Sequence, residues 1–534
     1  MTSSVVNTPI EKIPLVVSRC RNGFRTGVMR SIEQRKKILL SFLRMLDENE
    51  EVFCRAVHSD LRKHPNETKF AELSVLRVEA HHFLQHLDEY ALPEKPQMEG
   101  IFRLEECEIR RDPLGVVLVI GSWNYPLLLT LLPIVGALAA GNTVVAKPSD
   151  LAPASAGIMH ELLLKYIPDS IVGLVKGGVT ETTQLLEERF DHIFYTGNSR
   201  VAKIIMTAAA KQLTPVTLEL GGKTPVIVDA SCESNLGVVA RRIMWGKVLN
   251  AGQTCIAPDY VLVHRQIQTK LIEALKEARD EMMGANPLQN QEDYSAIVNT
   301  DHFDRLVGLL KGGTLVFGGE MDKVNRTIAP AVLTDVQLEH PIMTEEIFGP
   351  LLPLLPFDTA NDVFQFLGPR EKPLALYIFA DDKRFISNVV ENTFSGGVLV
   401  NDVVVHVAPS GLPFGGVGHS GMGAYRGKFS FETFSHKKPV MQRKMGLEFL
   451  NAPRYPPYTL DKFRVFRHAV ELSVGDRSVL SALAALLGSG AICCAGGSLY
   501  SLSYEGTTEK VKGKKTWPVW IKPSCFVFFF FCWR

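Results

Sequence analysis

The sequence predicts an α/β protein built on a doubly wound parallel sheet, followed by a second α/β set. The chain has 534 residues, which suggests two or three domains rather than a single core. Its composition, 46% apolar and 22% charged, is typical of a soluble globular protein. Strand-like and helical segments alternate between residues 115 and 222, which is the pattern of a parallel sheet with helices on both faces.

The predicted elements follow in chain order. Residues 30–90 combine helical apolar spacing with dense charge, and Pro93 and Pro96 end that helical region. Short segments rich in Val and Ile predict strands at 115–121, 143–149, 171–177, 191–197 and 214–222. The longer segments between them predict helices at 127–141, 152–167, 180–190 and 199–213. A second α/β set starts at 225–229 and continues to about residue 425.

Charge and cysteine usage exclude several classes of function. The formal net charge is +1, and no basic stripe with interleaved aromatic residues occurs, so we expect no nucleic-acid partner. The nine cysteines are dispersed and form neither a C-x-x-C pair nor a Cys–His metal spacing. This pattern indicates reduced thiols, a body that faces the cytosol and no metal site.

The first candidate for chemistry is Cys255, which ends the segment NAGQTC (250–255). The segment lies between a helix-like and a strand-like run, where a loop can present a thiolate nucleophile to a ligand. A small buried apolar residue is the alternative interpretation, because free cysteines are often buried.

Two further candidates follow predicted strands. Glu219 in LELGG ends a strand before two glycines, where a buried carboxylate could act as a general base. Its alternative is a surface or ion-paired glutamate. Asn124 in GSWNYP lies between a strand and a helix, where its amide could donate to an oxyanion or could cap the helix instead.

Other segments predict ligand contacts less specifically. Gly197 in FYTGNSRVAK precedes a helix, whose N-terminus favours phosphate, although the segment is not G-x-G-x-x-G. Lys147 in VAKPS lies at a strand end and could bind ribose or phosphate, or could be an ordinary solvated lysine. EEIFGP (345–350) places an acid and Phe348 beside a turn, and by itself indicates a packed loop.

Taken together and in this order, the motifs resemble the aldehyde dehydrogenase superfamily over about residues 10–455. The motifs are GSWNYP, VAKPS, YTGN, LELGGKTP, NAGQTC, EEIFGP and LPFGGVGHSGMG. The tyrosine of SWNYP and the closing GAYRGKFSFETFSH are similar to the class 3 branch. The resemblance implies the aldehyde dehydrogenase fold, with a Rossmann-like NAD-binding domain, an α/β catalytic domain and a small bridging β segment.

The resemblance implies three catalytic roles. Cys255 attacks the aldehyde carbon, and Asn124 with the Cys255 backbone N–H holds the oxyanion. The thiohemiacetal passes a hydride to the nicotinamide, after which Glu219 activates the water that hydrolyses the thioester. The implied activity is the oxidation of aldehydes to carboxylic acids.

The resemblance also implies a cofactor site. Glu346 holds the nicotinamide ribose with Phe348 against the ring, Lys147 binds the adenosine ribose, and Gly197 lets the backbone approach the cofactor. Trp123 belongs to the same cofactor-binding set. We expect NAD, with NADP as the alternative, because an acid follows the KPS motif and would repel a 2′-phosphate.

Two positions depart from the superfamily pattern. Ala202 occupies a position where the superfamily usually has glycine, so its methyl group is expected to shift the helix and the bound diphosphate slightly. Asp150 replaces the usual glutamate, and the shorter acid weakens discrimination against NADP.

The resemblance divides the chain into segments and implies a homodimer. The predicted parts are an NAD-binding domain (1–93 and 112–219), a catalytic domain (220–424), a bridging segment (94–111 and 425–448) and a C-terminal tail (449–534). Class 3 relatives form dimers through segments that correspond to 101–111 and to the residues after Gly427.

The tail carries a predicted membrane anchor at about 479–500. Residues 478–504 contain no charged side chain, and a helix over 479–500 would be about 33 Å long, enough to cross a hydrocarbon core of roughly 30 Å. The preceding residues 459–470 predict a short interfacial helix with apolar and basic sides. A buried hairpin or a flexible tail is the alternative for 479–500.

A C-terminal anchor on this scaffold resembles the fatty aldehyde dehydrogenases of the endoplasmic reticulum. It implies NAD-dependent oxidation of medium- to long-chain aliphatic aldehydes at that membrane, with the catalytic body facing the cytosol. The alternatives are a soluble class 3 enzyme for aromatic and medium-chain aldehydes, a catalytically idle scaffold and a cysteine hydrolase. The hydrolase would need a histidine beside Cys255, and none lies in the matched segments that are expected to converge on Cys255.

Overall fold

The computed structural model describes residues 6–99, 102–103, 105–284, 286–289, 292–446 and 448–471. The chain divides into two compact units, Met1–Pro96 with Glu106–Gln442, and Gln97–Glu105 with Arg443–Arg534. Both large sheets and every candidate site residue belong to the first unit.

The N-terminal region is helical, as the apolar spacing predicts. Its elements are α1 (Ile13–Arg25), α2 (Ile32–Glu48), α3 (Glu50–Leu61), α4 (Pro65–Thr68), the π-helical turn η2 (Lys69–Leu73) and α5 (Ser74–Ala91). The last helix ends two residues before Pro93, because a residue that precedes proline is disfavoured in the helical region.

The first large sheet has six strands in the order β16-β6-β5-β2-β3-β4. Its strands are β2 (Val116–Ile120), β3 (Thr143–Lys147), β4 (Val172–Leu174), β5 (His192–Thr196), β6 (Val216–Glu219) and β16 (Gly421–Met422). All five strands predicted between 115 and 222 are confirmed. They are parallel, as predicted, and a sixth strand from outside that range, β16, pairs antiparallel with β6 at the edge of the sheet.

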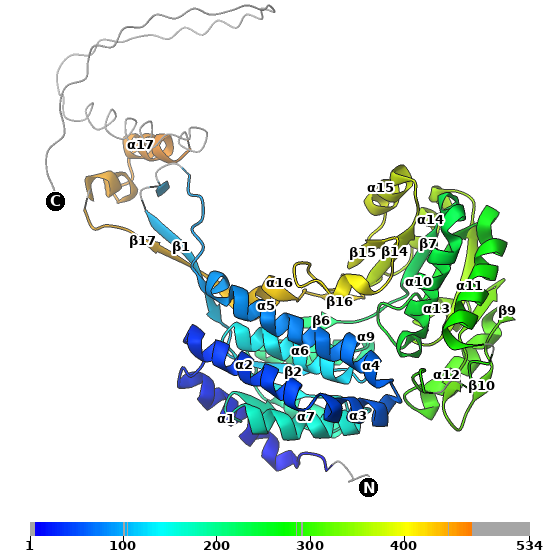
Figure 1. The fold of residues 1–534 in the computed structure, drawn as a ribbon. Helices are drawn as coiled ribbons and strands as arrows, with labels where there is room; N and C mark the ends of the chain where they lie inside the picture. The colour runs from blue at the N-terminus through cyan, green and yellow to red at the C-terminus, as the bar shows by residue number, and fades with distance from the viewer. Residues whose placement is uncertain are drawn as a thin grey trace, which may run out of the picture. The chain divides into compact units, whose positions relative to one another are not determined.

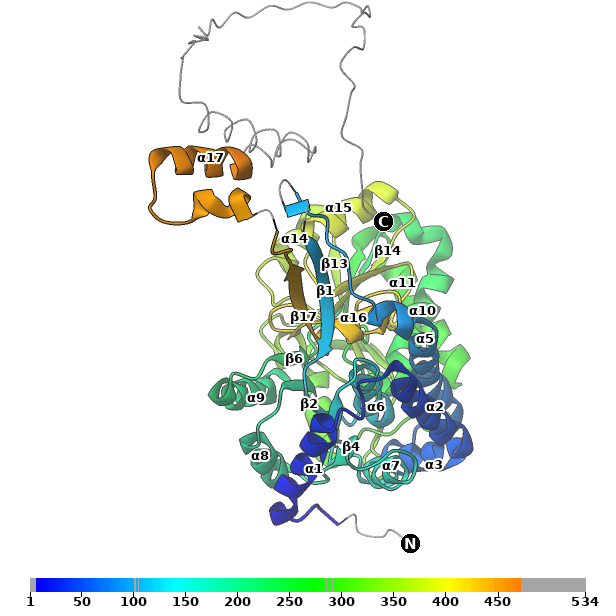
Figure 2. The same cartoon turned by 90° about the vertical axis from the view of Figure 1, so that its left-hand side faces the viewer.

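Alternate residues of β2 face opposite sides of the sheet, because successive side chains of a strand point in opposite directions. Val117 and Val119 belong to the apolar cluster beneath α6 (Pro126–Ala139), α7 (Pro153–Tyr166), α2 and α5. Val116 and Leu118 belong to the cluster beneath α1 and α9 (Ser199–Gln212). Figure 1 shows helices on both faces of this sheet, and α8 (Val179–Glu187) beside α9 is visible in Figure 2.

The second sheet has seven strands in the order β15-β14-β7-β8-β13-β12-β9. They are β7 (Pro225–Val228), β8 (Tyr260–His264), β9 (Thr314–Phe317), β12 (Ala331–Thr334), β13 (Leu351–Phe357), β14 (Ala375–Phe379) and β15 (Gly397–Val400). Only the β9–β12 pairing is antiparallel among the pairs of this sheet.

Helices cover both faces of the second sheet as well. One face packs with α10 (Leu236–Val248) and α11 (Gln268–Met283). The other packs with α12 (Thr300–Leu309), α13 (Pro341–Thr344), α14 (Ala360–Leu367) and α15 (Lys383–Asn392). The predicted second α/β set is therefore confirmed as a sheet of its own.

Two long strands form a separate antiparallel ribbon (Figure 2). These are β1 (Glu106–Pro113) and β17 (Ser435–Gln442), paired from Glu106 with Gln442 to Pro113 with Ser435. The short helix α16 (Gly427–Thr433) precedes β17. This ribbon corresponds in position to the predicted bridging segment.

The second unit contains η9 (Glu448–Arg454) and α17 (Leu460–Glu471). The helix predicted at 459–470 is confirmed, and its Leu460, Phe463 and Phe466 are exposed. No helix within the described part of the chain is long and apolar enough to cross a membrane. The predicted anchor at 479–500 lies outside the described residues.

Candidate active site

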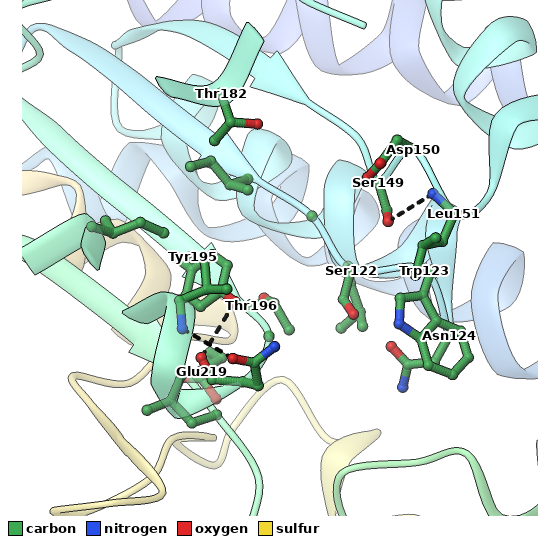
Figure 3. Close-up of a pocket in the computed structure, with 18 of the residues that line it drawn as sticks. Ser122, Trp123, Asn124, Ser149, Asp150, Leu151, Thr182, Tyr195, Thr196 and Glu219 are labelled. Atoms are coloured by element: carbon green, nitrogen blue, oxygen red, sulfur yellow. Dashed lines mark hydrogen bonds between the residues drawn. The ribbon is translucent and has the colours of Figure 1, made fainter. Parts of the chain in front are cut away.

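A cavity of about 530 Å³ opens beyond the carboxyl ends of the first sheet. The strands β2, β3, β5 and β6 are parallel and end at Ile120, Lys147, Thr196 and Glu219, so the residues that follow them meet at one edge. All eight predicted site residues line the cavity: Trp123, Asn124, Lys147, Gly197, Glu219, Cys255, Glu346 and Phe348. In Figure 3, Trp123 and Asn124 lie across the pocket from Thr196 and Glu219.

The loop before Cys255 has an unusual backbone. Asn250 and Ala251 have φ angles of 50° and 53°, and Gly252 follows with φ of 72°. A Cβ on Gly252 would lie 2.3 Å from the carbonyl oxygen of Gly349, so glycine permits both the backbone angle and the close approach. The loop thereby turns sharply and packs against the segment that carries Phe348.

Gln253 fixes this loop from inside. Its amide nitrogen donates to the carbonyl oxygens of Asn250 (3.1 Å) and Ala296 (3.0 Å), and its side-chain oxygen accepts from the N–H of Val298 (3.0 Å). The side chain is buried and binds only backbone groups in these contacts. The polar residue of NAGQTC therefore orders the loop that presents Cys255.

Cys255 is half-buried and faces the cavity. Burial raises the pKa of its thiol well above the ordinary range, and the nearby Glu346 and Glu219 raise it further. The thiol is thus protonated at neutral pH until a base accepts its proton. The charged groups that add to this effect of burial are two acids rather than an imidazolium, which is unlike the thiolate–imidazolium pair of cysteine hydrolases.

Glu219 is the last residue of β6, and it is buried with both carboxyl oxygens lacking a hydrogen-bond partner among the described residues. Burial raises the pKa of this carboxyl well above its ordinary value. The alternative of a surface or ion-paired glutamate is wrong. A buried, unpartnered carboxyl at the cavity is instead available to a water molecule or a thiol.

Asn124 is buried, and its side-chain amide donates to the carbonyl oxygen of Gln253 at 3.0 Å. An amide nitrogen carries two hydrogens, so a second one can serve an oxyanion. The helix-cap alternative is wrong, because the N-cap residue of α6 is Tyr125 rather than Asn124, and this cap makes no side-chain hydrogen bond. The N–H groups of Leu127 and Leu128 donate to Glu72 instead, at 3.0 and 3.1 Å.

Glu72 and its ion-pair partner Lys63 were missed by sequence reasoning. Both side chains are fully buried, their charged atoms lie 2.9 Å apart, and Lys63 also donates to the backbone oxygen of Asn124 at 3.0 Å. They lie in a charge-dense helical region in which solvated faces are the usual outcome. No signal in the local sequence distinguishes them from surface charges.

Glu346 and Phe348 approach the cavity from the second sheet. A Cβ on Gly221 would lie 2.4 Å from a Glu346 carboxyl oxygen, so glycine is needed beside that carboxyl. Burial and the charge of Asp259 raise the pKa of Glu346 to about 8. Phe348 has φ of 49°, and its ring meets that of Trp123 edge to face at 5.4 Å.

His302 and Arg305 of α12 also line the cavity, and the sequence analysis did not single them out. The ring of His302 lies 5.5 Å from that of Trp123, and Arg305 donates to the carbonyl oxygens of Glu346 (3.3 Å) and Ile347 (2.6 Å). Arg305 therefore holds the EEIFGP loop against the site.

Lys147 is only 5% exposed, so the solvated-lysine alternative is wrong. Its ammonium lies 3.7 Å from Asp150, and burial lowers its pKa. Gly197 lies beside this region, and a Cβ there would collide with the Tyr195 hydroxyl at 2.1 Å. Ala202 does not line the cavity but packs into the core beneath α9, so any effect of its methyl group on a bound diphosphate would act through the position of that helix.

The cavity suits a dinucleotide along its length. Apolar side chains of α8 and α9 line one part of it: Val179, Leu186, Val201, Ile204 and Ile205. Lys147 and Asp150 offer polar groups for a ribose, and the N-terminus of α9 provides backbone N–H groups near Gly197 and Asn198. The far end reaches Glu346, Phe348 and Cys255, where a nicotinamide would meet the thiol.

Comparisons with known proteins agree with this geometry. The profile of the aldehyde dehydrogenase family matches residues 4–440. Aldehyde dehydrogenase family 3 member A2 of Mus musculus is 46% identical over 446 residues, covering 84% of this chain and 92% of the relative. The dimeric NADP-preferring aldehyde dehydrogenase of Canis lupus familiaris is 44% identical over 448 residues, covering 84% and 98%.

Solved structures share the fold. The substrate-bound AldH of Staphylococcus aureus superposes with a TM-score of 0.82 at 37% identity, covering 86% of this chain and 99% of that one. An indole-3-acetaldehyde dehydrogenase complexed with NAD+ superposes with a TM-score of 0.75 at 25% identity, covering 82% and 90%. The chain belongs to the aldehyde dehydrogenase family.

Proposed function

We propose that this chain oxidises medium- to long-chain aliphatic aldehydes to carboxylic acids through a covalent intermediate on Cys255. Members of the family oxidise aldehydes with NAD or NADP, and the proposal adds the substrate class and the residue roles. The observation that carries the roles is one cavity in which the Cys255 thiol, the Asn124 amide and the Glu219 carboxyl meet, the last without a hydrogen-bond partner among the described residues.

The proposed reaction begins at sulfur. Sγ of Cys255 bonds to the aldehyde carbon while its proton passes to a base, and the carbonyl electron pair becomes an oxyanion. The Asn124 amide and the Cys255 backbone N–H donate to that oxygen. The Gln253 carbonyl orients the amide, so the donor is already in place when charge develops.

When bound, the nicotinamide supplies the acceptor for the hydride of the thiohemiacetal. The residues that would hold it are Glu346, Phe348 and Trp123, with Lys147 and Gly197 nearer the adenosine end. Glu219 then takes a proton from water, whose oxygen bonds to the thioester carbon. The C–S bond breaks, the carboxylic acid leaves, and the thiol regains a proton.

The preference for NAD is part of the proposal. Asp150 lines the cavity beside Lys147, where its carboxylate would repel a 2′-phosphate. One relative is named NADP-preferring, so the two cofactors must be compared directly.

The proposals of an aliphatic substrate and of a membrane location are based on the C-terminal part of the chain. Helix α17 exposes Leu460, Phe463 and Phe466 beside basic residues, and residues 478–504 carry no charge. A membrane-bound enzyme would meet aldehydes that partition into lipid. We propose a C-terminal anchor at about 479–500 in the endoplasmic reticulum membrane, with the body facing the cytosol, and a homodimer like the relative named dimeric.

The test is NADH formation by the full chain with hexadecanal and with benzaldehyde. The proposal expects a higher kcat/KM for hexadecanal and at least about 10³-fold lower turnover in Cys255→Ala, because the covalent step is lost. Cys107→Ala, at a half-buried thiol on β1 away from the cavity, is the matched control. Turnover of benzaldehyde alone would move the chain to soluble aromatic substrates, and full activity of Cys255→Ala would overturn the mechanism.

A further inference from the structure

Residues 63–72 join α3 to α5 and lie far in sequence from both loops of the site. Lys63 donates to Glu72 (2.9 Å) and to the backbone oxygen of Asn124 (3.0 Å), and its ammonium lies 4.0 Å from the centre of the Tyr125 ring. Glu72 accepts from the first N–H groups of α6. These contacts hold the turn that carries the proposed oxyanion donor.

A third residue of the same segment reaches the other loop. The N–H of Asn250 donates to a carboxyl oxygen of Glu67 at 2.9 Å. Asn250 starts the left-handed turn, and its side chain donates to the backbone oxygens of Asn124 (2.8 Å) and Gln253 (3.1 Å). The Asn250 backbone is therefore held from one side by Glu67 and its side chain from the other by the Asn124 turn.

The turn needs such support. Non-glycine residues in the left-handed region cost free energy and persist only where surrounding contacts over-determine them. Two such residues occur in succession at Asn250 and Ala251, five and four positions before Cys255. A carboxylate is a stronger acceptor for the Asn250 N–H than a neutral oxygen, because the bond is charge-assisted.

We propose that Glu67 is a positioning residue for Cys255: its carboxylate holds the 250–255 loop in the conformation that presents the thiol beside Asn124. The inference rests on the proposed role of Cys255 as nucleophile. Glu67 itself does not touch the aldehyde or the cofactor, and it does not line the cavity.

The charged and titratable groups around Glu67 come from four segments. They are Lys63 after α3, Glu72 of η2, Tyr125 before α6 and Tyr294 before α12. Burial raises the pKa of Glu67 to about 7, while Lys63 and the Asn250 N–H lower it and Glu72 raises it. The carboxylate fraction, and with it the stronger hydrogen bond, increases as pH rises through neutrality.

The test compares Glu67→Leu, which removes the acceptor, with Glu67→Gln, which keeps a neutral acceptor of the same shape. The first readout is the rate at which iodoacetamide alkylates Cys255, measured by peptide mass spectrometry on the full chain. The second is kcat with hexadecanal and NAD. We expect Glu67→Leu to slow both by about tenfold or more, because a small displacement of a reacting group is costly.

Glu67→Gln is expected to stay within a few-fold of the wild-type rates, and the ratio of wild-type to variant rates should rise between about pH 6 and pH 8. Glu51→Gln, at an exposed acid of α3, is the control for a change of surface charge. Wild-type rates in Glu67→Leu, or equal losses in both Glu67 variants, would overturn the proposal. Alkylation needs neither aldehyde nor cofactor, so absent turnover in the wild-type chain would count against the proposed function alone.

Discussion

Burial sets the chemistry of Glu219. Its carboxyl lies at the end of a buried strand with no hydrogen-bond partner among the described residues, which is costly for the ionised form. A partnered glutamate would be a weaker base for water. The same feature that makes Glu219 suitable for general-base catalysis therefore makes it unfavourable for folding.

Glu219→Gln tests both consequences. We expect turnover to fall by at least about 10²-fold, because the base is lost, while alkylation of Cys255 continues. The folded-state pKa of Glu219 is raised, so the native state keeps this proton to a higher pH than the unfolded state, whose carboxyl loses it above about 4.5. Wild-type stability should therefore fall with rising pH relative to the variant, and thermal melting of both proteins between about pH 5 and pH 8 checks this sign. An equal pH dependence of the two melting temperatures would contradict it.

Substitution of Asp150 tests whether a single side chain sets the preference for NAD over NADP. Its removal should relax repulsion of a 2′-phosphate, so we expect Asp150→Ala to lower KM for NADP by about tenfold while KM for NAD changes less. Steady-state kinetics with each cofactor measure this. Glu187→Ala, at an exposed acid of α8, provides the control. An unchanged ratio of the two KM values would show that Asp150 does not discriminate.

The arrangement of strands and helices determines where the catalytic groups lie, more than the local conformational preference of each residue does. Four parallel strands end at one edge, where the last residues of two of them, Lys147 and Glu219, meet Asn124 and Gly197 from the following loops in a single cavity. The opposite wall comes from loops of the second sheet, which add Cys255, Glu346 and Phe348. Helix α12 then holds the EEIFGP loop through Arg305.

Gly252→Ala tests the turn before Cys255. We expect unfolding free energy to fall by about 1–3 kcal/mol, because the residue has φ of 72° and its Cβ would lie 2.3 Å from Gly349 O. Urea denaturation followed by circular dichroism measures the loss. Gly237→Ala in α10 is the control, since nothing lies within 4 Å of its Cβ, and it should be stabilising by about 0.5–1 kcal/mol. Equal effects of the two substitutions would contradict the strained-turn argument.

For the whole molecule, the proposed membrane anchor assigns the C-terminal part the task of bringing the enzyme to its substrate. A chain that ends at residue 471 should retain turnover of water-soluble aldehydes, because it keeps every described residue that lines the cavity. The full chain should float with neutral phospholipid vesicles in a density gradient, whereas the shortened chain should remain in the dense fraction. Flotation of neither protein would remove the support for membrane anchoring, and aggregation of the full chain is checked by a gradient without vesicles.

The sequence by itself determined the fold class, because a buried parallel strand must be short and apolar and its helices must be amphipathic. The strands at β2, β3 and β5 and the helices between them could be placed within a few residues on this ground alone. The candidate site was predictable because its motifs follow strands and keep a recognisable order along the chain. Lys63, Glu67 and Glu72 were not predictable, since a charged residue in a largely helical, charge-dense region carries no local sign of burial.

Only the tertiary structure decided which polar side chains are buried away from solvent. It showed that Asn124 binds Gln253 rather than capping a helix, that Lys147 is buried, and that Ala202 belongs to the core instead of the cavity. It also placed residues 63–72 against two distant segments: the Asn124 turn, which lies more than fifty positions later in the chain, and the 250–255 loop, which lies more than 170 positions later. Periodicity reports which face of an element is apolar, whereas desolvation and hydrogen bonding depend on the distant segment that packs against that face.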